Sequence, residues 1–194
     1  MQTYYSIEAT KTTPAWDYLT DAQVKNYLKQ EANVTAENTL ITALTNAAQS
    51  QFEQMTNRAL CDGTLSARYY DIESKGTQID ITIPYRCTYS NISISYKYEN
   101  TTEALVENTD YYVNQNRISI NKSAFNYVST GIEIILTATL TADFVDPNVE
   151  PALYKMIADL YNYRGNDVVG ESVGRLSNTT KFLLEPFIDV NQMI

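Results

Sequence analysis

The chain of 194 residues contains no histidine, the side chain that most often acts as a general base at neutral pH and most often binds zinc. Catalytic schemes that pair serine or cysteine with histidine are therefore excluded. The glycine-rich phosphate loops G-x-x-x-x-G-K-[ST] and G-x-G-x-x-G are missing as well. We accordingly expect no enzyme, and no catalytic, cofactor-binding or metal-binding residues.

Cysteines and long apolar runs are also scarce. Cys61 and Cys87 are the only cysteines and lack a ligand-like spacing, so free thiols are favoured, although the sequence leaves a disulfide open. The longest nearly uncharged apolar run, Ile132 to Leu140, falls far short of the ~20 residues that a membrane helix needs. Residues 1–10 are polar and lack the apolar stretch of a secretory signal. The sequence thus predicts no membrane span and residence in the cytoplasm.

Basic residues are outnumbered, with 14 Lys and Arg against 23 Asp and Glu, and the formal net charge is −9. Proteins that hold nucleic acid cluster basic side chains against the phosphates, so tight DNA binding is disfavoured. An acidic surface can still border DNA by repelling it, as the wall of a channel should if DNA must slide through.

Helical signals stand on both sides of a β-rich middle. Thr20 and Gln23 form a capping box that predicts the start of a helix. Residues 36–57 repeat apolar side chains at three- and four-residue spacing, and Thr35 is expected to cap this second helix. Residues 150–165 repeat the pattern and predict a third helix.

From residue 64 to residue 142 the apolar period changes from 3.6 to 2, which predicts strands with one buried face. Gln115 and Asn116 separate two such runs and predict a tight hairpin turn. Sixteen tyrosines, several of them adjacent pairs, favour sheet packing and protein interfaces over ligand stacking.

These patterns predict an α+β fold, in which a bundle of about three helices carries a β-rich antiparallel insertion and an extended C-terminal arm. The expected parts are an N-terminal arm (1–19), a helical part (20–62), the β-rich insertion (63–143), a third helix that packs on the helical part (144–165), and a linker with the C-terminal arm (166–194).

Carboxylates are the remaining candidates for chemistry. We interpret the first group as a solvated loop, and it consists of Glu99, Glu103, Glu107 and Asp110. We interpret the second group as part of the first turn of the third helix, and it consists of Asp143, Asp146 and Glu150. Acids at a helix start stabilise its dipole without any further function, and neither group has the spacing of a calcium loop. A carboxylate-based hydrolase and a glycan-binding β module built on the tyrosines remain the alternatives.

Short motifs follow one another in a fixed order between residues 19 and 187. They are the helical segments 19–28, 40–44 and 56–60, the hairpin strands 111–113 and 117–120, the strand 134–142, the helical segments 149–153 and 160–164, and the tail motif 183–187. Together they resemble the bacteriophage head-tail connector family, also called DNA-packaging or head-completion adaptor proteins. Two features depart from the family pattern, because Asp143 replaces a frequent glycine and the β segment is longer.

The resemblance implies a virion protein of the neck, assembled in the host cytoplasm. Its copies would form a ring, commonly twelve-fold, that docks below the portal protein and extends the DNA channel. The ring would also attach the next neck or tail protein, with DNA as passing cargo and no membrane contact. A tail or neck protein at another position in the virion is the alternative.

An apolar cluster near the C-terminus is the expected partner-binding site. The cluster follows the glycine-bearing residues 166–177 and consists of Phe182, Leu183, Leu184 and Phe187. Such a cluster either folds back onto the helices or docks on a partner, and we expect it to bind a neighbouring copy or the portal. Deleting residues 176–194 is accordingly expected to leave a folded monomer that associates poorly with the portal.

Overall fold

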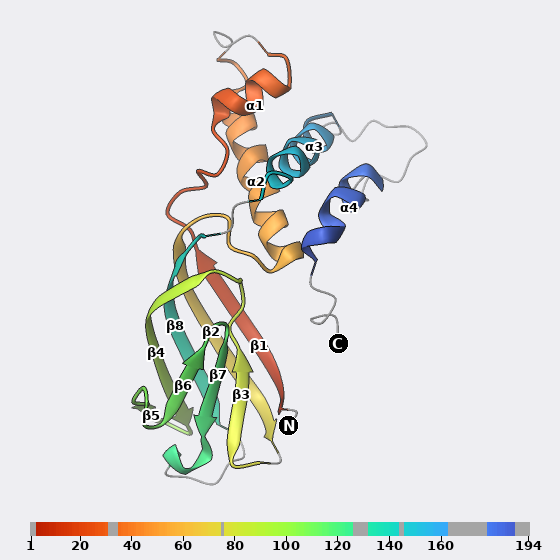
Figure 1. Cartoon of the computed structure of the whole chain (residues 1–194). Helices are drawn as coiled ribbons and strands as arrows, with labels where there is room; N and C mark the ends of the chain where they lie inside the picture. The colour runs from red at the N-terminus through yellow and green to blue at the C-terminus, as the bar shows by residue number, and fades with distance from the viewer. Residues whose placement is uncertain are drawn as a thin grey trace. The chain divides into compact units, whose positions relative to one another are not determined.

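The computed structural model describes residues 3–30, 35–74, 76–125, 132–143, 146–162 and 178–188. The chain divides into two units, and each is discontinuous in sequence. The β unit comprises residues 1–14 and 62–143, and the helical unit comprises residues 15–61 and 144–194. Helices and antiparallel sheets are thus both present, in agreement with the expected α+β class (Figure 1).

The β unit contains two antiparallel sheets. A five-stranded sheet has the order β1-β2-β8-β4-β5, and a three-stranded sheet has the order β3-β7-β6 and lies over one of its faces (Figure 1). The strands are β1 (Thr3–Thr12), β2 (Gly63–Ser74), β3 (Gln78–Thr82), β4 (Thr88–Tyr98), β5 (Thr101–Ala104), β6 (Tyr111–Asn114), β7 (Arg117–Asn121) and β8 (Glu133–Thr141).

The core of the β unit follows from the period-2 alternation of its strands. In the central strand β8, the residues from Ile134 to Leu140 alternate between buried apolar side chains and more accessible ones. Tyr69 of β2 is fully buried on the same inner face, and its hydroxyl donates a hydrogen bond to the Thr82 carbonyl of β3 at 2.8 Å. The two sheets therefore enclose one apolar core, and the predicted last strand is confirmed.

β1 shows that the expectation of a loose N-terminal arm is wrong for these residues. The strand pairs with β2 from Thr3 opposite Ser74 to Thr12 opposite Thr64. Its side chains also reach the other sheet, where Thr3 Oγ1 accepts a hydrogen bond from the Asp80 N–H at 3.2 Å. Tyr5, Ile7 and Ala9 do alternate with Ser6, Glu8 and Thr10, but this apolar run is short and weak, so the sequence analysis did not predict the strand.

Neighbouring tyrosines lie on opposite faces of their strands, as expected for sheet packing. Tyr69 is buried and Tyr70 is exposed, while Tyr111 is buried and Tyr112 is exposed. Burial raises the pKa of the Tyr69 hydroxyl well above its usual value. The buried members of the pairs therefore belong to the core rather than to a stacking platform.

The hairpin predicted at Gln115 and Asn116 is confirmed. β6 and β7 pair from Tyr111 opposite Ile120 to Asn114 opposite Arg117. Gln115 has a φ of 55°, in the left-handed region that glycine or asparagine usually occupies in such turns. Strand pairing, and not a favoured turn residue, therefore sets this hairpin.

The helices of the helical unit are α1 (Asp21–Tyr27), α2 (Asn38–Thr56), α3 (Val149–Asn162) and α4 (Asn178–Leu184), and the short 3₁₀ turn η2 (Glu185–Phe187) follows α4. A second 3₁₀ turn, η1 (Lys122–Ala124), belongs to the β unit. No helix in the described residues is long and apolar enough to cross a membrane.

Helix starts were predicted with mixed success. The capping box of α1 is confirmed, because the Gln23 N–H donates to Thr20 Oγ1 at 3.3 Å and the Thr20 N–H donates to Gln23 Oε1 at 2.9 Å. Thr35 is not the cap of α2, whose N-cap is Glu37 without a side-chain capping bond. The Glu37 carboxylate instead accepts hydrogen bonds from Gln30 Nε2, at 2.8 Å, and from the Tyr161 hydroxyl. The Glu37 side chain, at the start of α2, thus connects the segment that follows α1 with the end of α3.

The C-terminal segment is not the extended arm that the sequence predicted, because it forms α4 and η2. Leu184 and Phe187 stand three residues apart, so they share one side of the helical turn and are buried in the core of the helical unit. The bundle therefore contains four helices in its described residues rather than about three. The predicted helix end at Gly165 and the linker at 166–177 lie outside the described residues.

Glu53 fixes the turn that leads out of α2. The helix ends at Asn57, which has a φ of 52°. The Glu53 side chain is only 2% exposed, and its Oε1 accepts hydrogen bonds from the backbone N–H groups of Leu60, at 2.7 Å, and Cys61, at 3.2 Å. A carboxylate is a strong acceptor for such donors, so this single side chain holds residues 57–61 against the helix.

Replacing Glu53 with Ala should destabilise the helical unit, because two buried N–H groups would lose their acceptor. We expect a loss on the order of 1–3 kcal/mol in the free energy of unfolding for each unsatisfied group. Urea unfolding followed by circular dichroism measures this loss. Glu53→Gln keeps one acceptor oxygen and should lose less than Glu53→Ala, whereas equal stability of Glu53→Ala and the wild type would contradict the assignment.

The two cysteines should differ in reactivity. Neither forms a disulfide, Cys61 is buried and Cys87 is half-buried, and burial raises the pKa of the Cys61 thiol. We expect a thiol-specific colorimetric reagent to label Cys87 first and to reach Cys61 only in denaturant. Cys87→Ser should abolish the fast phase. Two equally fast phases in the native protein would show that Cys61 is accessible.

Candidate docking surfaces

The four residues of the predicted C-terminal binding site divide into two sets. Leu184 is fully buried and Phe187 is 4% exposed, while Leu183 packs partly buried against the same helical core. Phe182 is 74% exposed and points away from that core. Of the four, only Phe182 therefore offers a large apolar surface to a partner.

Packing and hydrogen bonds hold α4 in place within the helical unit. The Phe187 ring lies 5.6 Å from the Phe52 ring of α2, measured between centroids. The buried Thr180 hydroxyl donates to Asp159 Oδ2 at 2.7 Å, and Asp159 Oδ1 accepts from Lys155 Nζ at 2.6 Å. α4 is thus part of the folded unit, so deleting residues 176–194 should unfold or destabilise that unit rather than leave an intact monomer.

A second surface is the outer face of the five-stranded sheet, turned away from the three-stranded sheet. Two rows of hydroxyl side chains cross four strands there, with neighbours paired in register. Seven of the eight side chains are exposed and Thr139 is half-buried. We call this surface the hydroxyl face, and its rows are Thr10, Ser66, Thr137 and Ser93, and Thr12, Thr64, Thr139 and Ser90.

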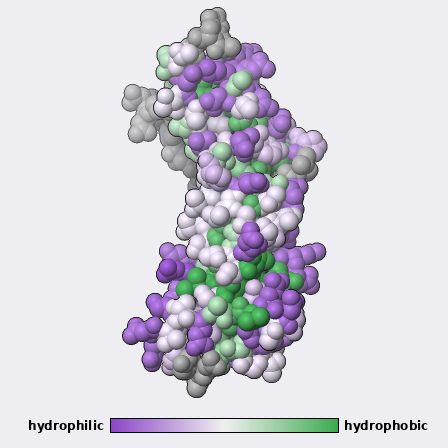
Figure 2. All heavy atoms as spheres, turned by 90° about the vertical axis from the view of Figure 1, so that its left-hand side faces the viewer, coloured by the Kyte–Doolittle hydropathy of each residue, from purple (hydrophilic) through white to green (hydrophobic). Residues whose placement is uncertain are grey.

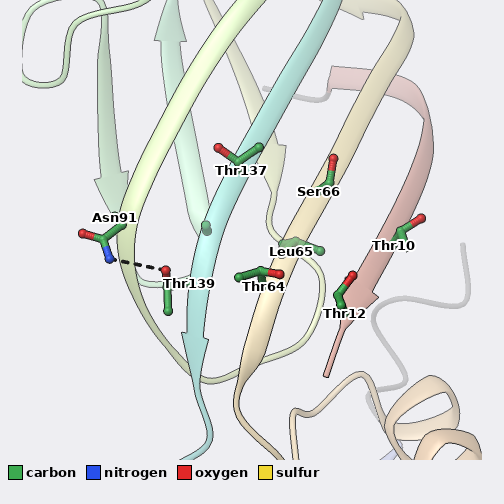
Figure 3. A pocket seen from close by; sticks show the side chains of 9 residues that line it. Thr10, Thr12, Thr64, Leu65, Ser66, Asn91, Thr137 and Thr139 are labelled. Atoms are coloured by element: carbon green, nitrogen blue, oxygen red, sulfur yellow. Dashed lines mark hydrogen bonds between the residues drawn. The ribbon is translucent and has the colours of Figure 1, made fainter. Parts of the chain in front are cut away.

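A β-bulge shapes one border of the hydroxyl face. The pairing of β4 with β8 shifts between Ser90 and Ser93, and Asn91 within the bulge has a φ of 50°. Asn91 Nδ2 donates to Thr139 Oγ1 at 3.3 Å, and a hollow is lined by these two residues and by their neighbours on β1, β2 and β8 (Figure 3). The bulge therefore turns an amide toward the hydroxyl rows.

Charged residues border the two rows at both ends, and at one end they balance. Glu8 of β1 stands opposite Arg68 of β2, Arg68 Nη1 lies 3.5 Å from Glu133 Oε1, and Glu133 stands opposite Lys97. These four residues contribute two negative and two positive charges, which sum to zero, whereas the whole chain carries −9. The hydroxyl rows are thus uncharged, with a charge-balanced group at one end and the carboxylate of Asp143, bonded to Thr88, at the other.

Three of the carboxylates considered as catalytic candidates accept hydrogen bonds from neighbouring groups. Glu103 accepts a hydrogen bond from the Tyr96 hydroxyl at 2.5 Å, and Asp110 accepts one from the Val106 N–H at 2.8 Å. Asp143 accepts one from the Thr88 hydroxyl at 2.6 Å. Within the described parts of the chain, no three acidic or cysteine side chains are placed to share a metal ion.

Apolar residues also reach the surface of the β unit. Figure 2 shows hydrophobic residues gathered on the side of this unit that carries β4 and β5. Val106, which follows β5, is 60% exposed, while its neighbour Leu105 is buried. This region is therefore a second apolar part of the surface, at positions where the sequence predicted no binding site.

Replacing each of two phenylalanines of the C-terminal segment with alanine should affect stability to very different degrees. Phe187→Ala removes a buried ring and should lower the free energy of unfolding by about 3–5 kcal/mol. Phe182→Ala removes an exposed ring and should change it by no more than about 0.5 kcal/mol. Thermal and urea unfolding of both variants measure the difference. Equal effects would show that α4 does not pack on the helical core.

Among the comparisons with known proteins, the one with solved structures gives matches. No family model matches the chain, and no curated protein matches it. Solved structures with the same fold include a chain in the neck of an empty gene transfer agent particle computed with C6 symmetry, with 15% identity, a TM-score of 0.65, and coverage of 95% of this chain and 96% of that chain.

Two further structures agree with that match. They are the virion of a native gene transfer agent particle (14% identity, TM-score 0.65, 95% of each chain) and the neck of a native particle computed with C12 symmetry (13% identity, TM-score 0.62, 95% of this chain and 96% of that chain). The likeness includes both the β unit and the helical unit. Over 95% of its length, the chain therefore has the fold of chains in gene transfer agent particles, including two structures of the neck.

Proposed function

We propose that this chain is a structural subunit of a phage-like virion neck, where its copies form a ring. The observation that carries the proposal is the fold shared over 95% of the chain with neck chains of gene transfer agent particles. The ordered sequence motifs that resemble head-tail connectors support the same role independently. The ring docks below the portal, extends the DNA channel and attaches the next neck or tail protein.

Several copies of the chain are needed for this role. The related necks were computed with C6 and C12 symmetry, and these symmetries belong to closed rings. A ring of identical chains is built by two different patches on each subunit, one for each neighbour.

The proposed role requires neither catalysis nor tight binding of DNA. The chain has no histidine, and Glu103, Asp110 and Asp143 each accept a hydrogen bond from a neighbouring group. A net charge of −9 weakens any attraction to phosphates. The subunit therefore acts as a passive wall past which DNA moves as cargo.

Phe182 is the anchor that we assign to portal binding. Its ring is 74% exposed, and the buried Leu184, Phe187 and Thr180 hold its helix in place. Exposed aromatic side chains on a rigid support often carry much of the energy of an interface, because little conformational freedom is lost when they bind. We propose that Phe182 inserts into an apolar pocket of the portal, with Leu183 beside it.

Replacing Phe182 with Asp tests this anchor. The variant should bind assembled portal protein of the same particle with an affinity loss of about 2 kcal/mol or more, roughly 30-fold, and should keep the unfolding temperature of the wild type. Co-sedimentation with portal rings measures the binding. Tyr4→Asp, at a side chain 58% exposed in the β unit, is the matched control. Unchanged binding of Phe182→Asp would contradict the anchor, and cryo-EM that places the chain away from the portal would contradict the role.

A further inference from the structure

We infer that neighbouring β units stack face to face around the ring, with the hydroxyl face of one copy against the outer face of the three-stranded sheet of the next. The inference rests on the proposed ring and adds which surfaces meet in it. The occupant of the hydroxyl face is thus a second copy of this chain.

Electrostatic repulsion between copies restricts where they can meet. Each copy carries a net charge of −9, so most pairs of surfaces bring carboxylates together, and like charges across an interface oppose association. The eight residues of the hydroxyl face carry no charge, and the four charged residues at one end of it sum to zero, while Asp143 adds one carboxylate at the other end. Contact through this face therefore keeps the repulsion small.

The outer face of the three-stranded sheet has a matching character. Its outward side chains form rows across β6, β7 and β3, and two hydrogen bonds join them, from Gln78 Nε2 to Asn121 Oδ1 at 3.1 Å and from Ser119 Oγ to Asp80 Oδ1 at 2.6 Å. We call this surface the amide face, and its residues are Tyr112, Ser119 and Asp80, then Asn114, Arg117 and Thr82, then Asn121 and Gln78. One acid and one base are present, so this face is also neutral.

The two faces lie on opposite sides of one sandwich. The inner faces of the sheets contact each other, as the Tyr69 hydrogen bond to Thr82 and the rings of Tyr96 and Phe125, 5.1 Å apart, show. The outer faces must then point in opposite directions. Two different and opposed patches are what a head-to-tail contact needs, and such contacts generate rings when the rotation between copies closes.

The side chains of the hydroxyl face favour a specific contact. Serine and threonine lose little rotamer freedom on burial, in contrast to lysine or glutamate, and threonine on a strand is already restricted at χ1. Hydroxyl groups both donate and accept hydrogen bonds, so they can pair with the amides of Asn114 and Asn121 directly or through water. The contact is polar and ordered rather than apolar.

Passing DNA is the competing occupant of the hydroxyl face. A surface that holds phosphates supplies lysine or arginine, and neither hydroxyl row contains one. The second copy is therefore the occupant that the charges favour, and the following experiment separates the two.

Paired cysteines test the stacking directly in the full-length protein. In a Cys87→Ser background, which removes the accessible native thiol, Thr137→Cys and Asn114→Cys are made singly and together. A short bismaleimide should convert the double variant into a ladder of dimers, trimers and larger species up to closed rings. Each single variant should yield no ladder, because the two cysteines of a head-to-tail contact lie on different faces.

Charge variants provide an independent measurement. Thr137→Glu places a carboxylate in the middle of the hydroxyl face and should raise the concentration needed for ring formation roughly tenfold or more. Thr137→Ser keeps the hydroxyl and is the matched control. Analytical ultracentrifugation measures the assembly, and unchanged unfolding temperatures show that each variant is folded.

The outcomes separate this inference from the proposed function. Rings that form normally with Thr137→Glu, together with no ladder from the double variant, would overturn the face-to-face stacking and leave the ring proposal intact. Dimers from the Thr137→Cys single variant alone would show a two-fold contact and overturn it as well. If passing DNA rather than a second copy occupies the hydroxyl face, this face is uncovered in assembled rings. The Thr137→Cys variant would then react with maleimide in the rings, and this result would also overturn the stacking. Wild-type protein that joins neither rings nor neck particles at any concentration would overturn both proposals.

Discussion

The strict alternation of β8 is the constraint on which the β unit depends. This strand lies between β2 and β4, and its register with both is fixed by Ile134, Leu136, Ala138 and Leu140 on the inner side. A slip by one residue would expose these apolar side chains and bury threonines instead. The register of β8 therefore determines both the apolar core and the hydroxyl face, and a change of register would alter both.

Strong periodicity made several elements predictable from sequence. The capping box at Thr20, the apolar stripe of α2, the hairpin at Gln115 and the strand β8 all follow from local patterns that tertiary contacts reinforce. β1 was not predicted because its apolar alternation, Tyr5, Ile7 and Ala9, is short and weak, as in many edge strands. The role of Glu53 was not predicted either, because the sequence does not show whether a glutamate is exposed or is buried and accepts two backbone hydrogen bonds.

The candidate surfaces were less predictable than the fold. Sequence located the apolar C-terminal cluster but could not divide it, because only the packing of α4 shows that Leu184 and Phe187 face inward while Phe182 faces outward. The hydroxyl face was invisible in the sequence, since its residues come from four strands that are distant along the chain. Only the register of β1, β2, β8 and β4 assembles them into rows.

The interleaving of the two units along the chain has a consequence for biosynthesis. β1 is synthesised before β2 and β8, the strands that complete its sheet, and α1 and α2 are synthesised before α3 and α4, on which they pack. Both units are therefore rich in contacts between distant residues, which slows folding. A chain interrupted before the end of β8 has neither a finished sandwich nor a finished helical core. A chain interrupted between β8 and α4 has the complete sandwich but an unfinished helical core, so it lacks the surface that carries Phe182.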